Sequence, residues 1–108
     1  MDKISETVER AFSASRLAKA AIDAARQAAD LCRRNPSDHT PVNAAYWLCR
    51  AAQDACDSAA DALDPDWVQE HPAVFGAHQL VSLTSDEVCG AADDLVTAAA
   101  ELGFKITK

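Results

Sequence analysis

The sequence has few glycines, no long apolar run and no excess of positive charge, and each shortage narrows what the protein can be. Only Gly76, Gly90 and Gly103 occur, too far apart to build a phosphate-binding loop. The formal net charge of −7 argues against nucleic acid or an anionic lipid surface as a partner. No apolar run reaches membrane-spanning length, and no signal-peptide core follows the N-terminal MDKISETVER. We therefore expect a cytoplasmic protein whose thiols stay reduced.

The motifs of common catalytic and metal sites are also missing. There is no C-x-x-C sequence and no E-x-x-H pair of the kind that di-iron bundles use. Cys49 and Cys56 are seven residues apart, whereas two ligands for one metal on a helix lie three or four apart. We predict no enzymatic activity, no cofactor and no metal site, and interpret the cysteines as small buried hydrophobic residues. Convergence of Cys32, Cys49, Cys56 and Cys89 in a thiol or metal site is the alternative.

Aromatic residues are scarce too, only six in 108, and alanine supplies much of the apolar content. Alanine has the highest helix propensity and a small side chain. A core built from it stabilises the fold by letting helix backbones approach closely rather than by bulk. The length corresponds to one domain with a thin core, so we predict a single helical-bundle domain over residues 1–108.

Hydrophobic periodicity predicts a long helix over residues 3–34 and a second helix that begins at Thr40-Pro41. The first apolar seam alternates steps of four and three: Ile4, Val8, Ala11, Ser15, Ala18, Ile22, Ala25, Ala29 and Cys32. A second row beside it, Leu17, Ala21, Ala24, Ala28 and Leu31, makes the apolar face wide enough for more than one neighbour. The second helix has the seam Val42, Ala45, Cys49, Ala52, Cys56, Ala59 and Leu63. The short loop between them predicts an antiparallel hairpin.

The remaining third of the chain predicts a short helix over residues 72–82, followed by a last long helix ending near residue 102. Pro72 suits the first position of a helix, and Thr84 with Glu87 has the spacing of a capping box. Gly103 suits the left-handed position after a helix, and Phe104 is expected to fold back on the last turn. The predicted fold is therefore all-α, an antiparallel helical bundle of three long alanine-rich helices plus one short helix. On this division the first helix, roughly 45 Å long, exceeds its neighbours.

The charge is unevenly distributed along the chain. Residues 1–34 carry a net charge of +2, whereas residues 35–108 carry −9. In the stretch DACDSAADALD, four aspartates recur at steps of three, four and three: Asp54, Asp57, Asp61 and Asp64. This ridge lies opposite the apolar seam of its helix. A solvated face that keeps an alanine-rich protein in solution would explain it, but aspartate is a poor helix former and such faces usually mix both signs.

The aspartates are easier to explain if they bind positive charge on another macromolecule. Trp47 and Arg50 share their outward side of the helix, and tryptophan is a frequent anchor in protein interfaces. We therefore hypothesise a small acidic binding protein that occludes a basic, Arg/Lys-rich surface of a protein partner. The predicted contacts are Trp47, Arg50, Asp54, Asp57, Asp61 and Asp64. Immunity proteins and phage-encoded inhibitors of nucleic-acid-binding defence machines act by such occlusion. Coverage of Trp47 by a neighbouring helix is the alternative interpretation of that residue.

A second hypothesis gives the apolar face of the first helix a different purpose. That face is broad enough to pair with a second copy of the chain, which would make the protein a homo-oligomeric structural bundle. A buried thiol or metal site is the third hypothesis.

Overall fold

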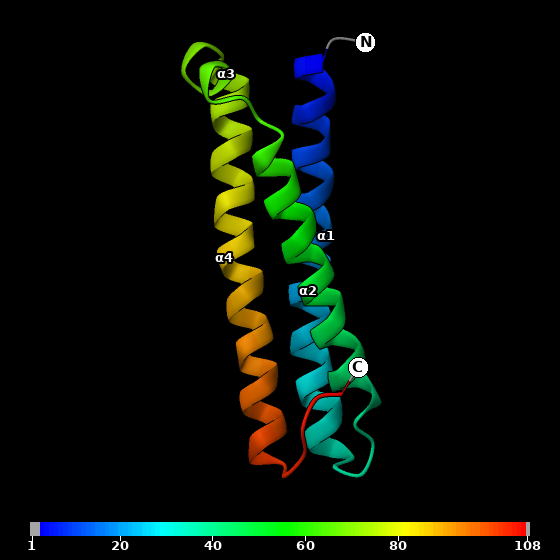
Figure 1. Cartoon of the computed structure of the whole chain (residues 1–108). Helices are drawn as coiled ribbons and strands as arrows, with labels where there is room; N and C mark the ends of the chain where they lie inside the picture. The colour runs from blue at the N-terminus through cyan, green and yellow to red at the C-terminus, as the bar shows by residue number, and fades with distance from the viewer. Residues whose placement is uncertain (1–2, 108) are drawn as a thin grey trace.

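Three long helices lie side by side in the computed structural model, which describes residues 3–107 (Figure 1). They are α1 (Lys3–Arg34), α2 (Thr40–Asp61) and α4 (Pro72–Glu101), and the short α3 (Pro65–Glu70) connects the last two. The chain forms a rod of 52 × 21 × 20 Å. Both α1 and α4 run antiparallel to α2, so they are parallel to each other (Figure 1). The predicted all-α bundle of three long helices and one short helix is confirmed.

The core is an alanine seam with a few larger residues in it. Fully buried alanines occur on both partners of the hairpin, Ala11, Ala18 and Ala21 on α1 and Ala52 and Ala59 on α2. Leu95 and four valines supply most of the remaining volume: Val42, Val74, Val81 and Val88. Because the side chains along the seam are small, the helix backbones approach closely, and this proximity fixes the register of the hairpin.

Two cysteine contacts define that register. The thiol of Cys49 lies 3.6 Å from the carbonyl oxygen of Ala21, and that of Cys56 lies 3.6 Å from the carbonyl oxygen of Ala14. The two helices are therefore in a fixed antiparallel register: residue n of α1 lies level with residue 70 − n of α2, as Ala21 does with Cys49 and Ala14 with Cys56.

The prediction of a helix break near residue 83 is wrong, because α4 is continuous from Pro72 to Glu101. Thr84 is buried rather than capping, and its hydroxyl donates to the carbonyl oxygen of Leu80 at 2.9 Å. This bond occupies the hydroxyl within the helix, and the seam Val81, Thr84, Val88 continues without a proline or glycine to interrupt it. The short helix is instead α3. With 30 residues, α4 nearly matches the 32 of α1, so α1 has no unmatched excess.

Side chains of the preceding loops accept backbone N–H groups at the starts of α2 and α3. Asp64 accepts the backbone N–H of Asp66 at 2.8 Å and so caps α3. Thr40, at which the sequence predicts this helix to begin, is already helical, and Asp38 accepts its backbone N–H at 3.1 Å. The predicted start of this helix is therefore correct within one residue, and its N-cap residue, His39, makes no side-chain capping hydrogen bond.

The C-terminal segment crosses the end of the bundle instead of folding only onto its own helix. Gly103 has φ +84°, as predicted, and the backbone N–H of Phe104 donates to the carbonyl oxygen of Ala99 at 2.9 Å. The Phe104 ring then stacks on His39 in the loop between α1 and α2, with centroids 3.7 Å apart. In Figure 1 this segment passes in front of the lower ends of the helices.

The parallel pair α1 and α4 carries opposite net charge. Seven basic and four acidic residues give α1 a charge of +3, whereas α4 has five acidic residues and no lysine or arginine. Parallel helices place like ends of their dipoles together, which is mildly unfavourable. Attraction between an anionic and a cationic helix offsets that repulsion.

Candidate binding surfaces

The aspartate ridge divides between internal contacts and exposed carboxylates. Asp57 accepts a hydrogen bond from the hydroxyl of Ser85 on α4 at 2.9 Å. Asp64 lies beyond the end of α2 and caps α3. Asp54 and Asp61 are exposed on α2 and form no ion pair with any residue in the range 3–107. All four members of the ridge are exposed to solvent, and two of them also make hydrogen bonds within the fold.

Arg50 does not neutralise the ridge in this structure. Its guanidinium donates to the side-chain oxygen of Gln53 at 3.3 Å rather than to Asp54. The two ion pairs found within residues 3–107 both lie on α1, between Asp23 and Arg26 and between Asp30 and Arg33. Arg26 and Arg33 thus pair within α1, and no ion pair in the described part of the chain reaches the carboxylates of α2.

Trp47 lies beside the ridge and is partly covered by the C-terminal segment. Its indole N–H donates to the carbonyl oxygen of Thr107 at 2.8 Å, and Asn43 accepts the backbone N–H of that threonine at 3.2 Å. The ring meets Tyr46 edge to face with centroids 5.1 Å apart. Trp47 remains 39% exposed, so neither α3 nor α4 buries it. The tail fixes its orientation and leaves much of the ring accessible.

The last helix adds carboxylates to the same side of the molecule. Ser82, Asp86, Cys89, Asp93 and Val96 follow one another on α4 at steps of four and three. This stripe adjoins Ser85, whose hydroxyl reaches Asp57, so Asp86 lies close to the ridge. Asp93 lies two turns, about 10 Å, further along α4. Because α4 and α2 are antiparallel, that position is level with Arg50.

We call this surface the acidic face and define it as Trp47, Asp54, Asp57 and Asp61 of α2 with Asp86 and Asp93 of α4. The spacing of Asp86 and Asp93 is visible in the sequence, but it could not be connected to α2 without knowing how the two helices are rotated. The four aspartates not engaged by Ser85 are exposed. Val96, on the same stripe of α4, is 48% exposed.

Three of the four cysteines are core residues. Cys32, Cys49 and Cys56 are fully buried, as the seam predicted, and Cys89 is half-buried on the stripe of α4. Burial raises the pKa of the Cys49 thiol. Burial and the nearby Asp57 raise the pKa of Cys56, while a hydrogen bond with Thr84 opposes the shift. Within residues 3–107, no three side chains of the types that bind metals lie close enough together to hold an ion.

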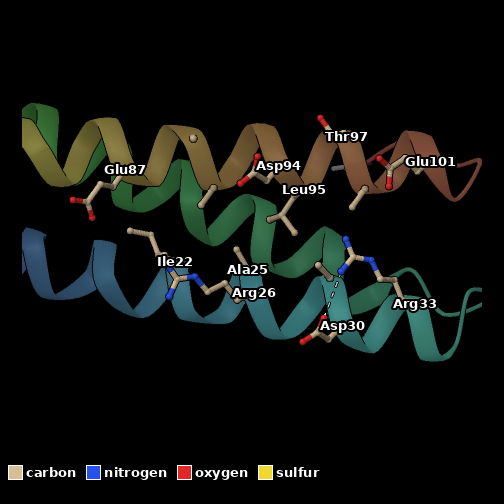
Figure 2. Close-up of a pocket in the computed structure, with 14 residues that line it drawn as sticks. Ile22, Ala25, Arg26, Asp30, Arg33, Glu87, Asp94, Leu95, Thr97 and Glu101 are labelled. Carbon is tan, nitrogen blue, oxygen red and sulfur yellow. Dashed lines mark ion pairs between the residues drawn. The ribbon is translucent and has the colours of Figure 1, made fainter.

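A groove of about 720 Å³ runs between the C-terminal halves of α1 and α4 (Figure 2). Its floor is apolar and includes Ile22, Ala25 and Leu95. Its walls differ in sign: Arg26 and Arg33 project from α1, and Glu87, Asp94 and Glu101 from α4 (Figure 2). The arginines of α1 and the acidic residues of α4 each recur every seven residues, so each set forms a row along its own helix. Within residues 3–107 no ion pair joins the two walls; Arg26 and Arg33 pair with Asp23 and Asp30 of their own helix.

Comparison with models of protein families, with curated protein sequences and with solved structures finds no match to this chain. In the part of the chain that the structure describes, no helix combines the length and the apolar character needed to cross a membrane.

Proposed function

We propose that this chain is a small cytoplasmic binding protein whose acidic face occupies a basic surface of a protein partner and thereby blocks it. The observation that carries the proposal is the gathering of unneutralised carboxylates from two helices on one face. Five carboxylates would repel a phosphate backbone, so the matching surface is rich in arginine and lysine and belongs to a protein. An inhibitor or immunity-type protein, including a phage-encoded anti-defence protein, works by such occlusion.

The identity of the acidic residues supports a direct contact. Aspartate holds its carboxylate close to the helix backbone, so the anions stand on a stiff scaffold and lose little freedom on binding. Hydrogen bonds between guanidinium and carboxylate groups are among the stronger polar contacts at interfaces. Trp47, held by Thr107 and still 39% exposed, supplies apolar contact at the end of the same surface.

Charge reversal on the acidic face tests the proposal. The tagged chain is used to capture partners from an extract of the native host, in parallel with the variant Asp57→Lys/Asp61→Lys. The matched control is Asp23→Lys/Asp30→Lys, which makes the same change in charge on exposed positions of α1. We expect the wild type and the control to retain the same partner and the Asp57/Asp61 variant to lose it.

Circular dichroism of all three proteins shows whether the helices persist, and lysine is the better helix former of the two residues. Equal retention by the two variants, with helicity intact, would contradict the proposal. Loss of the partner by the control alone would place the binding surface on α1 instead.

Salt provides a second test on the captured partner. Exposed charges are screened beyond about 8 Å at physiological ionic strength and beyond about 3 Å at 1 M salt. We therefore expect the association rate to fall steeply with salt while the dissociation rate changes less, because complementary charge acts mainly on encounter. Surface plasmon resonance at several salt concentrations separates the two rates. An association rate independent of salt would rule out electrostatic recognition.

A further inference from the structure

The middle of the surface formed by α1 and α2 on the side away from α4 carries no charged residue. Toward the N-terminus the same row of α1 continues to the exposed Arg10 and Glu6. Two stripes with the same spacing lie next to each other there, one of α1 and one of α2. The stripe of α1 is Ser13, Leu17, Ala20, Ala24, Gln27 and Leu31, and that of α2 is Ala44, Leu48, Ala51, Ala55, Ser58 and Ala62. We call these twelve residues the apolar face. None of them is ionisable, although a quarter of the whole chain is charged.

The leucines of the apolar face are far from buried. Leu17, Leu31 and Leu48 are 37%, 51% and 36% exposed, and the alanines Ala20, Ala44 and Ala51 are exposed around them. A shallow cleft of about 200 Å³ lies between the helices at one end, lined among others by Ala24, Leu31 and Leu48. Small residues beside such a cleft let another helix approach closely, as the alanine seam does within the bundle.

The dimensions of the apolar face suit a dimer interface. Each stripe spans about 27 Å, and two neighbouring helices are roughly 20 Å wide, which gives on the order of 540 Å² per copy. Two such faces in contact would bury about 1,100 Å², just above the roughly 1,000 Å² expected of a specific interface. Contiguous apolar patches of this size are at the upper end of what monomeric proteins expose.

Net charge indicates what covers the face. The two helices that form it have opposite charge, since α1 carries +3 and α2, with one arginine and three aspartates, carries −2. A second copy turned about an axis parallel to the rod places each α1 over the other copy's α2, so the attraction occurs twice. We propose that the apolar face of α1 and α2 is the site at which a second copy of this chain packs, forming a central four-helix layer.

The dimer interface and the acidic face are largely separate surfaces. The part of the acidic face nearest α4 is the part farthest from the apolar face, and it consists of Asp57, Asp86 and Asp93. Asp54 and Asp61 lie between that part and the apolar face. A dimer therefore presents two acidic faces on its flanks. The inference does not rest on the proposed function, because self-association needs no partner protein.

Sedimentation equilibrium of the purified chain over a wide range of concentrations tests the inference. We expect the wild type to approach twice the monomer mass as concentration rises. Ala51→Glu and Leu48→Glu should remain monomeric, because each places a charge in the middle of the apolar face. Ala51 is exposed and glutamate is a good helix former, so Ala51→Glu leaves the monomer folded. The control Leu83→Glu changes a leucine of α4 that is 58% exposed and lies off this face.

Three results would overturn the inference: a wild type that stays monomeric at the highest concentration, a dimer that survives Ala51→Glu, or dissociation caused by Leu83→Glu. Circular dichroism distinguishes dissociation from unfolding. The Asp86→Lys/Asp93→Lys variant leaves the charges of α1 and α2 unchanged and should dimerise normally, so failure of partner capture and failure of self-association are separate outcomes.

Discussion

At the scale of single residues, the fold depends on small side chains whose size cannot change. Ala18, Ala21 and Ala52 have no exposed surface, and they occupy the line along which α1 and α2 approach. Alanine at these positions contributes little hydrophobic surface itself, but it sets the distance between the helices and hence the contacts of every larger neighbour. Larger residues would force the helices apart.

The first prediction concerns the seam. Ala52→Leu inserts three carbon atoms into a closed contact, and we expect it to lower the free energy of unfolding by about 1–3 kcal/mol or more. Ala100→Leu, at an exposed position of α4, is the control and should change it little. Urea denaturation followed by circular dichroism measures both. A seam that accepts leucine without loss would show that the core is loosely packed.

Two glycines are predicted to respond in opposite directions to the same substitution. A Cβ atom at Gly90 would meet no other atom within 4 Å, and the residue lies inside α4, where glycine costs about 0.5–1 kcal/mol relative to alanine. Gly90→Ala should therefore stabilise the protein. Gly103 has a positive φ of 84°, which favours glycine, so Gly103→Ala should destabilise it by about 1 kcal/mol. Thermal denaturation of the pair gives shifts of opposite sign, and shifts of equal sign would contradict the local geometry.

Thiol chemistry should follow burial. Desolvation raises the pKa values of Cys49 and Cys56, so both are protonated at neutral pH and out of reach of reagents. Cys32 is also fully buried, whereas Cys89 is half-buried. We expect one thiol of the native protein to react quickly with a thiol reagent and three to react only at the rate of unfolding. Mass spectrometry of digested protein should place the first adduct on Cys89; an adduct on a core cysteine first would be contrary to the structure.

At the scale of elements, the local sequence pattern predicted α1 and α2 correctly. It placed the start of the last long helix near residue 84, whereas α4 begins at Pro72. The apolar residues of α1 and α2 recur at steps of three and four, and Asn35-Pro36 and Thr40-Pro41 mark where the first helix ends and the second begins. Together they define the helical hairpin. Thr84 and Glu87 have the spacing of a capping box, yet the motif requires a free helix start, and packing of Val81 and Val88 on the same seam keeps the helix continuous. Spacing alone cannot distinguish a cap from a buried threonine.

The C-terminal segment is an element whose role depends on tertiary contacts that no periodicity reveals. Phe104 stacks on His39, and Thr107 holds the indole N–H of Trp47. Removal of residues 104–108 should lower stability and leave Trp47 more exposed. In a Trp67→Phe background, tryptophan emission would then shift to longer wavelength in the native state. An unchanged spectrum would mean that the segment does not cover Trp47 in solution.

At the scale of the whole molecule, three helices give three surfaces of different character. The α1/α2 surface is apolar, the α1/α4 groove has walls of opposite charge, and the α2/α4 surface is acidic. The sequence predicted the aspartates of α2, because their spacing is a property of one helix. It could not predict that Asp86 and Asp93 join them, because that depends on the rotation of α4 that the hydrogen bond between Ser85 and Asp57 reports.

The most direct measurement of the central claim is a calorimetric titration of the captured partner with the wild type and with Asp86→Lys/Asp93→Lys. These two residues come from the half of the acidic face that only the three-dimensional structure brings to α2. We predict at least a tenfold loss of affinity, about 1.4 kcal/mol or more, relative to the control Asp23→Lys/Asp30→Lys. An affinity equal to that of the control would contradict a binding surface shared by α2 and α4.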